Sequence, residues 1–177
     1  MSLEELWQLF PINLVPHSPL WKEQYAREAK RIQSFLPDST IAAISHIGST
    51  AIESIWAKPI VDILLEVSDD VSKDEIGAVL VKNGYTQMSA EKMSFNKGYT
   101  PTGFAEEVFH LHLRSKGDED EVYFRDYLNA HPDIAKEYEA LKLALWKRHE
   151  HDRDKYTDEK SDFVQRIVEK AKKEAQT

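Results

Sequence analysis

The sequence predicts an α/β (α+β) fold, in which a β-sheet with flanking helices is followed by a C-terminal helical segment. Three observations lead to this prediction. Strand-like runs of β-branched and apolar residues lie in the first two thirds of the chain, and amphipathic helical patterns fill the last third. No repeat, low-complexity tract or long Pro/Gly/Ser linker separates the two parts. We therefore expect one domain over residues 1–177, with its core at about 14–115 and packed helices at about 119–173.

The first half of the chain alternates between helical and strand patterns. Ser18 and Pro19 resemble an N-cap followed by a proline in the first turn, and an apolar stripe with helical spacing then continues to Leu36. Pro59 keeps the residue before it extended, which favours a strand at that point. The predicted elements here are a helix ending near Leu36, strands at Thr40–Ile47 and Ile60–Val67, and a helix at Ser72–Asn83 that Gly84 stops.

The second half contains one clear strand pattern and three helical patterns. Tyr85–Phe95 fits two short strands, and Glu107–Arg114 alternates apolar and polar residues as a strand does. Helices are predicted at Glu119–Asn129, Ile134–Arg148 and Asp158–Lys173. We interpret the charged stretch His149–Tyr156, between the last two helices, as a solvated turn.

Composition and charge narrow the classes of function. The chain has no cysteine, which excludes disulfides and thiolate ligands or nucleophiles within this sequence. Its net charge of −8 is spread along the chain, and no basic stripe is present that would neutralise a nucleic-acid duplex. The net charge does not exclude a small anionic ligand, because such a ligand needs only a few local cations. The start is acidic and no apolar run approaches the roughly 18 residues that span a bilayer, so we expect a cytoplasmic protein without a membrane partner.

The candidate chemistry lies in a Gly-Ser turn and in the strand that follows it. The turn at Gly48–Ser49 ends a predicted strand, and a glycine there lets backbone amides approach a phosphate closely. Asp62 stands in the largely apolar strand Ile60–Val67, where an unsatisfied carboxylate is costly. A bound divalent cation would satisfy this carboxylate. The sequence therefore indicates a site for a small phosphorylated ligand and a metal ion.

Several blocks of sequence together resemble the GrpB family, which is nucleotidyltransferase-like. The blocks are His46–Thr50, Ala57–Ile63, His110–His112, Phe124–Leu128 with His131–Pro132, and Tyr156–Phe163. A Gly-Ser turn, a short helix and a strand that carries an aspartate are also similar to the signature of the nucleotidyltransferase superfamily. The resemblance extends from about Leu14 to Ala171, which is nearly the whole chain.

The resemblance implies a nucleotidyltransferase-like mixed sheet and metal-dependent transfer of a nucleotidyl group from a nucleoside triphosphate to an unknown acceptor. In that account Gly48 and Ser49 hold the triphosphate, Lys58 neutralises phosphate charge, and Asp62 ligates Mn²⁺, Mg²⁺ or Zn²⁺. The alternative is a catalytically inactive module that binds a nucleotide or phosphate, or has a regulatory role. Because a relative in some bacteria is fused to dephospho-CoA kinase, the resemblance links that alternative to coenzyme A metabolism.

One position departs from the pattern of the catalytic superfamily. That pattern requires a second acid two residues after the first, and here the position is Leu64. Glu66 shares a strand face with Asp62, but four residues place the two roughly 13 Å apart along the strand. Two catalytic metal ions lie only about 3.5–4 Å apart. Glu66 is therefore a poor replacement, and Leu64 favours the binding module.

Two histidines complete the candidate site from another predicted strand. His110 and His112 share one strand face, a spacing that presents two imidazoles to one ion and equally fits two polar residues on a solvated face. We assign Asp62 and His112 as candidate catalytic groups and Asp62, His110 and His112 as candidate metal ligands. The structural alternatives are a simple tight turn at Gly48–Ser49, an ion pair of Asp62, and a surface position for Lys58.

Overall fold

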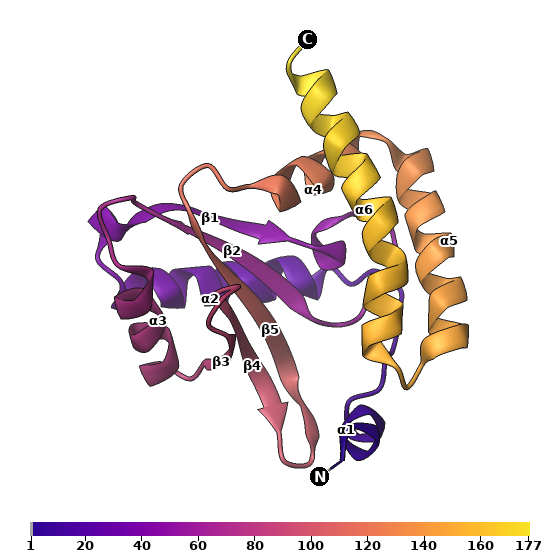
Figure 1. Ribbon diagram of the computed structural model, residues 1–177, viewed down its shortest axis with the longest axis horizontal. Helices are drawn as coiled ribbons and strands as arrows, with labels where there is room; N and C mark the ends of the chain where they lie inside the picture. Colours follow the sequence, from indigo (N-terminus) through magenta and orange to yellow (C-terminus); the bar gives the residue numbers. More distant parts are fainter. Residues whose placement is uncertain (1) are drawn as a thin grey trace.

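A five-stranded mixed sheet forms the centre of the computed structural model, which describes residues 2–177 (Figure 1). Its strands are β1 (Ile41–Ile47), β2 (Val61–Val67), β3 (Thr86–Ser89), β4 (Ser94–Thr100) and β5 (Gly103–Ser115). They lie side by side in the order β1-β2-β5-β4-β3. β2 and β5 run parallel, and every other neighbouring pair is antiparallel. The predicted mixed α/β fold is confirmed, including the two short strands expected near Tyr85–Phe95.

The helices surround this sheet (Figure 1). They are α1 (Leu3–Leu9), α2 (Leu20–Phe35), α3 (Lys73–Lys82), α4 (Asp120–Ala130), α5 (Pro132–His149) and α6 (Arg153–Ala175), with short 3₁₀ turns at Asp38–Thr40 and Ser49–Ala51. The charged turn predicted between the last two helices is present but shorter than the stretch His149–Tyr156, because α5 continues to His149 and α6 begins at Arg153. The Asp152 side chain accepts a hydrogen bond of 3.1 Å from the Lys155 amide, and this cap starts α6 at Arg153.

One face of the sheet forms the main apolar core. Alternate residues of the two central strands point to this face because strand side chains alternate with a period of two. They are Val61, Ile63, Leu65 and Val67 of β2 and Phe109, Leu111 and Leu113 of β5. Ile32 of α2 and Ile76 and Leu80 of α3 complete the same cluster. Burial of this face accounts for much of the stability of the fold.

The opposite face carries the remaining residues of the same two strands. They are Asp62, Leu64 and Glu66 of β2 and His110, His112 and Arg114 of β5, which pair in register. Helices α4–α6 lie on this side, and a second apolar cluster joins them to Ile52 and Ile55 after β1. Arg125 of α4 donates a 3.0 Å hydrogen bond to the carbonyl of His46 and so anchors the helix to β1. The C-terminal helices thus cover the polar face of the sheet.

Two features near the N-terminus were not anticipated from the sequence. α1 is a short helix whose Ser2 and Glu5 form a capping box. It ends beside the tip of the β4–β5 hairpin, where the ring of Phe10 lies 5.0 Å from the rings of both Tyr99 and Phe104.

Within residues 2–177, no helix combines the length and apolar character that a membrane crossing requires.

Candidate functional site

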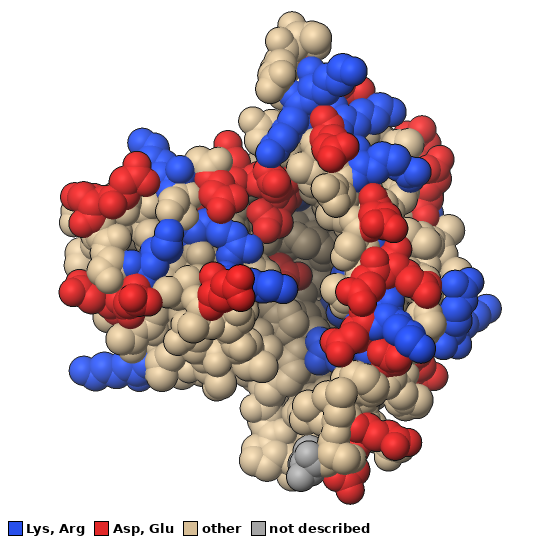
Figure 2. Space-filling model, in the orientation of Figure 1, with Lys and Arg blue, Asp and Glu red and all other residues tan. Residues whose placement is uncertain are grey.

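A cleft lies between the polar face of the sheet and helices α5 and α6. It has a volume of about 320 Å³, within the size range typical of small-molecule sites. Figure 2 shows the molecule hollowed between the part that carries the sheet and the part that carries these helices. The side chains that concern its chemistry are Ser49, Lys58, Asp62, His110, His112, Lys142, Arg153, Tyr156 and Lys160. All the predicted site residues, including Gly48, line this one cleft.

Asp62 occupies the centre of the site. Its Oδ1 atom lies 3.7 Å from His110 Nδ1 and 3.7 Å from His112 Nε2, and its side chain is 26% exposed. Burial alone would raise the pKa of Asp62, but interactions with His112, His110 and Lys160 outweigh it and hold that pKa below its ordinary value. Asp62 is therefore a carboxylate that is ionised at neutral pH.

Two conditions require a glycine at position 48: its backbone conformation and the close approach of the Asp62 side chain. Its φ of +75° lies in the left-handed region that favours glycine. A Cβ atom added there would lie 3.0 Å from Asp62 Cγ and collide with the Oδ2 atom of that carboxylate. The sequence suggested that this glycine makes room for a phosphate. Its close contact in the structure is with the aspartate of the next strand.

His110 joins Asp62 to a chain of polar groups. Its Nε2 atom is 2.6 Å from the Tyr99 hydroxyl, which accepts a 3.2 Å hydrogen bond from Arg153 Nη2. Burial lowers the pKa of His110 to about 4, despite the nearby charge of Asp62. His110 is therefore neutral at pH 7, with one ring nitrogen able to accept a bond. This state is the one that a metal ligand or a weak base requires.

The helices contribute positive charge that the sequence did not reveal. Lys142, Arg153 and Lys160 enter the cleft from α5 and α6, and Lys58 enters it from the loop before β2. Burial and the repulsion of Lys160, Arg153 and Lys142 hold the pKa of Lys58 well below its usual value, against the opposing effect of Asp62.

Lys142 is the most deeply buried of the four cations, with 1% of its surface exposed. It donates a 2.7 Å hydrogen bond to the carbonyl of Trp56. Burial, followed by the charge of Lys160, lowers the pKa of Lys142 to about 7. The free energy needed to keep this lysine charged is therefore substantial.

Tyr156 lies between two of these lysines. The Nζ atoms of Lys58 and Lys160 are 5.1 Å and 5.3 Å from the centre of its ring. The ring is fully buried, and its hydroxyl has no hydrogen-bond partner among the described residues. Native proteins rarely leave such a group unpaired, so its position in the cleft is compatible with a ligand that supplies the partner.

Sequence reasoning missed Lys142, Arg153, Tyr156 and Lys160. A signal for the last three was present, because positions 153, 156 and 160 share one face of a helix. Two of them also belong to the block Tyr156–Phe163 that carries the family resemblance. Lys142 gave no signal, since a lysine in an amphipathic helix ordinarily faces solvent.

β2 supplies only one of its two carboxylates, that of Asp62, to the cleft. Leu64, opposite His112 in β5, is fully buried. Glu66 accepts a 2.9 Å hydrogen bond from the amide of Gly117 and is 3% exposed, so it holds a loop rather than a ligand. Across the described residues, no three His, Cys, Asp or Glu side chains form a group that could hold a metal ion. Asp62 and the two histidines approach such a group without completing it.

The comparisons with known sequences identify one family. A family model described as GrpB protein matches residues 11–170. The UPF0157 protein YqkA of Bacillus subtilis is 33% identical over 177 residues, which cover 98% of this chain and 51% of the relative. The chain therefore spans about half the length of that relative. A dephospho-CoA kinase of Mycolicibacterium paratuberculosis is 26% identical over 174 residues, covering 82% of this chain and 42% of that enzyme.

Solved structures show the same fold. The crystal structure of GrpB from Enterococcus faecalis superposes with a TM-score of 0.77 and 26% identity, covering 93% of this chain and all of that one. The poly(U) polymerase Cid1, in a structure with MgGTP bound, gives a TM-score of 0.53 and 14% identity over 83% of this chain and 47% of Cid1. The likeness to Cid1 concerns the fold, which is that of nucleotidyltransferases.

Proposed function

The chain belongs to the GrpB family, and we propose that its cleft binds the phosphate groups of a nucleoside triphosphate together with a divalent cation. The observation that carries the proposal is the charge of the cleft. Lys58, Lys142, Arg153 and Lys160 line it, and Asp62 is the one carboxylate among its described lining residues. Asp120 and Glu121 line the adjoining hollow, which shares Asp62, His112 and Lys160 with the cleft. A triphosphate carries enough negative charge to balance this surplus.

Electrostatics explains why this surplus favours a ligand. Burial, and after it the repulsion of neighbouring cations, holds the pKa values of Lys58 and Lys142 below their usual values, so keeping these lysines charged in the cleft costs free energy. Such a cluster does not stabilise the free protein. Phosphate oxygens would accept charge-assisted hydrogen bonds from all four side chains and relieve the repulsion. Relief of this electrostatic repulsion would contribute to the affinity for the ligand.

The resemblance in fold supports a nucleotide rather than another anion. The structure of Cid1 with MgGTP shows that this fold can place a nucleotide with its metal ion. In this chain Ser49, at the end of β1, faces the same cleft as the four cations. We assign Gly48 and Ser49 to the triphosphate and Lys58 to neutralisation of its charge.

The residues around Asp62 fit a cation that arrives with the nucleotide. One carboxylate oxygen lies 3.7 Å from a nitrogen of each histidine, so oxygen and imidazole ligands converge from neighbouring strands. Asp62 with His110 or His112 would hold the ion, and phosphate oxygens and water would complete its coordination. Imidazole suits Mn²⁺ or Zn²⁺ better than Mg²⁺. The ion would supply charge neutralisation beside the phosphates.

A second candidate function is nucleotidyl transfer to an acceptor hydroxyl, favoured by the two histidines beside Asp62. The acceptor oxygen would attack the α-phosphorus, the bond from that phosphorus to the bridging oxygen would break, and pyrophosphate would leave. His112 would accept the hydroxyl proton, and Lys58 and Arg153 would bind the departing charge. Leu64 argues against this candidate, because the usual second carboxylate is missing.

Thermal unfolding with a panel of ligands tests the binding proposal. ATP, GTP, CTP and UTP are added separately with Mg²⁺, Mn²⁺ or Zn²⁺, and dephospho-CoA and coenzyme A test the link to coenzyme A metabolism. A ligand at 100 times its Kd contributes about 2.7 kcal/mol, which raises the melting temperature measurably. Asp62→Asn, Ser49→Ala and Lys58→Met should reduce the shift, whereas the exposed Val81→Ala on α3 should not. Absence of a shift with every triphosphate would contradict the proposal.

Two further measurements separate binding from catalysis. Calorimetry with Zn²⁺ and Mn²⁺ compares the parent with His110→Ala, His112→Ala and Asp62→Asn. Equal metal affinities in all four proteins would mean that the histidines are not ligands and only form a polar face of the strand. Release of pyrophosphate from ATP is then measured for the parent and for His112→Ala. A parent protein that binds the triphosphate but releases no pyrophosphate with any acceptor supplied is a binding module.

A further inference from the structure

A second, apolar pocket opens beside the cleft and shares part of its wall. It has a volume of about 290 Å³ and is lined by residues of the N-terminal segment, the loop before β2, β5 and the start of α6. Lys58, Ile60 and Arg153 line both spaces. Two of the four cations of the cleft, Lys58 and Arg153, therefore lie at the boundary between the charged cleft and the apolar pocket.

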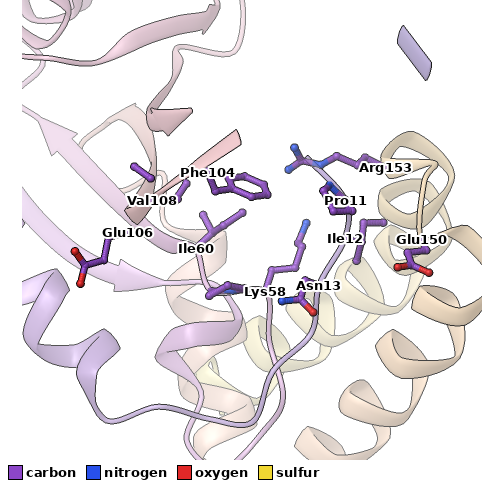
Figure 3. Close-up of a pocket in the computed structure, with 12 residues that line it drawn as sticks. Pro11, Ile12, Asn13, Lys58, Ile60, Phe104, Glu106, Val108, Glu150 and Arg153 are labelled. Atoms are coloured by element: carbon purple, nitrogen blue, oxygen red, sulfur yellow. The ribbon is translucent and has the colours of Figure 1, made fainter. Parts of the chain in front are cut away.

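Most side chains around this pocket are apolar, and two carboxylates, those of Glu106 and Glu150, also line it. In Figure 3, Ile60, Phe104 and Val108 lie on one side of the opening and Pro11 and Ile12 lie on the other, while Lys58 and Arg153 project between them. The side chain of Asn13, next to Lys58 in Figure 3, offers both a hydrogen-bond donor and an acceptor.

Phe104 gives the pocket an aromatic surface that is fixed before any ligand binds. Its ring packs edge-on against Phe10 at 5.0 Å and against Tyr99 at 5.1 Å, and 39% of the residue remains exposed. Tyr99 also bonds to His110 and Arg153 of the cleft. The aromatic group is thus tied to the charged site through one tyrosine.

From this juxtaposition we infer that the apolar pocket holds the nucleoside end of the nucleotide, with the base against Phe104 and the phosphates on Lys58 and Arg153. The inference rests on the proposed binding of a nucleoside triphosphate and adds the position of its base. A nucleoside triphosphate has the required shape, since a planar ring is attached through a sugar to a polyanion. Stacking on an aromatic ring and hydrogen bonds from an amide side chain are common ways to hold a base.

Calorimetry with ATP and with inorganic tripolyphosphate, both in the presence of Mg²⁺, tests the assignment. The parent should bind ATP more tightly than tripolyphosphate, because only ATP occupies the apolar pocket. Phe104→Ala removes the ring, and Ala105→Trp fills the space. Each should weaken ATP binding by about fivefold to tenfold, given the partial exposure of the ring, and should leave tripolyphosphate binding unchanged. Val81→Ala, which removes an exposed apolar side chain on α3, is the matched control.

The two ligands separate failure of this inference from failure of the proposed function. If ATP binds no more tightly than tripolyphosphate, or if both pocket variants bind ATP as the parent does, the base lies elsewhere and the phosphate site stands. If neither ligand binds the parent, the proposed function fails and the base assignment fails with it. A loss confined to ATP in both variants supports the pocket assignment, even if one variant is less stable.

Discussion

Two clusters of charged residues in this protein differ in their charge balance. On the side of the apolar core, Glu28 of α2 accepts hydrogen bonds from Lys97 at 2.9 Å, Tyr85 at 2.9 Å and Arg31 at 3.2 Å. Every charge there has an opposite partner. In the cleft, by contrast, Asp62 is the one carboxylate that lines the space with four cations, and the hydroxyl of Tyr156 has no hydrogen-bond partner, as far as residues 2–177 are concerned. The balanced cluster completes the fold, and the surplus charge of the unbalanced cluster is what the proposed phosphate ligand would neutralise.

This difference distinguishes the charges that stabilise the fold from those of the proposed site without reference to sequence motifs. A buried ion pair with satisfied partners is expensive to break, because removal of one member leaves an uncompensated charge. A buried cation without an anion is expensive to keep, so its removal relieves the folded state. Variants in the two clusters should therefore change stability in opposite directions, and the predictions below are ordered by expected effect.

The largest effect is expected from removal of the C-terminal helices. A chain that ends at Gly117 keeps every member of the Glu28 cluster but loses Lys142, Arg153 and Lys160 of the cleft. It also exposes Ile52 and Ile55, which pack against α4–α6. We predict that this shortened chain does not unfold cooperatively in a denaturant titration followed by circular dichroism. A soluble, monomeric chain with a cooperative transition would mean that the helices form an independent unit.

Glu28→Ala should be the most destabilising single change in the balanced cluster. The carboxylate side chain is 6% exposed, and its loss leaves the partly buried amine of Lys97 without a partner. The expected loss in the free energy of unfolding is about 3 kcal/mol. Urea unfolding measures it, and Glu28→Gln, which retains the acceptor for Tyr85, should lose less. An unchanged midpoint for Glu28→Ala would remove the basis for calling this cluster structural.

Lys142→Met should change the pH dependence of stability more than stability itself. The pKa of Lys142 is about 7 in the folded protein, against 10.5 when unperturbed, so between these values the unfolded chain binds more protons. Stability of the parent should therefore gain a contribution that grows as pH rises from about 7 to about 10.5. The variant should lack that rise, and its stability at pH 7 should equal or exceed that of the parent. Unfolding curves from pH 6 to about pH 10 measure the difference, and parallel profiles would contradict the assignment.

The central strands of the sheet were predicted correctly because their sequences show which residues are apolar and which are polar on each face. The alternation in Glu107–Arg114 and the apolar run around Asp62 located β5 and β2. β5 begins earlier than expected, at Gly103, because it continues into a hairpin with β4. The N-terminal helix α1 was missed, since a capping box followed by only seven helical residues is a weak local signal.

More of the candidate site was located from the sequence than was missed. The located residues lie within recognisable motifs and are Gly48, Ser49, Lys58, Asp62, His110 and His112. Lys142, Arg153 and Lys160 come from helices, where their charges resemble an ordinary solvated face until the fold turns them onto the sheet. The role of Glu66 could not be predicted from the sequence either, because its hydrogen-bond partner is a backbone amide in a loop that is distant in the chain.

The most direct test of the account compares one lysine from each cluster. Inorganic tripolyphosphate with Mg²⁺ is titrated by calorimetry into the parent, Lys58→Met and Lys97→Met at pH 6.5, where Lys142 is still largely charged. The account predicts that the parent binds, that Lys58→Met weakens binding by about tenfold or more without loss of stability, and that Lys97→Met loses stability but keeps the affinity. Equal affinities for all three proteins, or no binding to the parent, would contradict the central claim that the unbalanced cluster is a phosphate site.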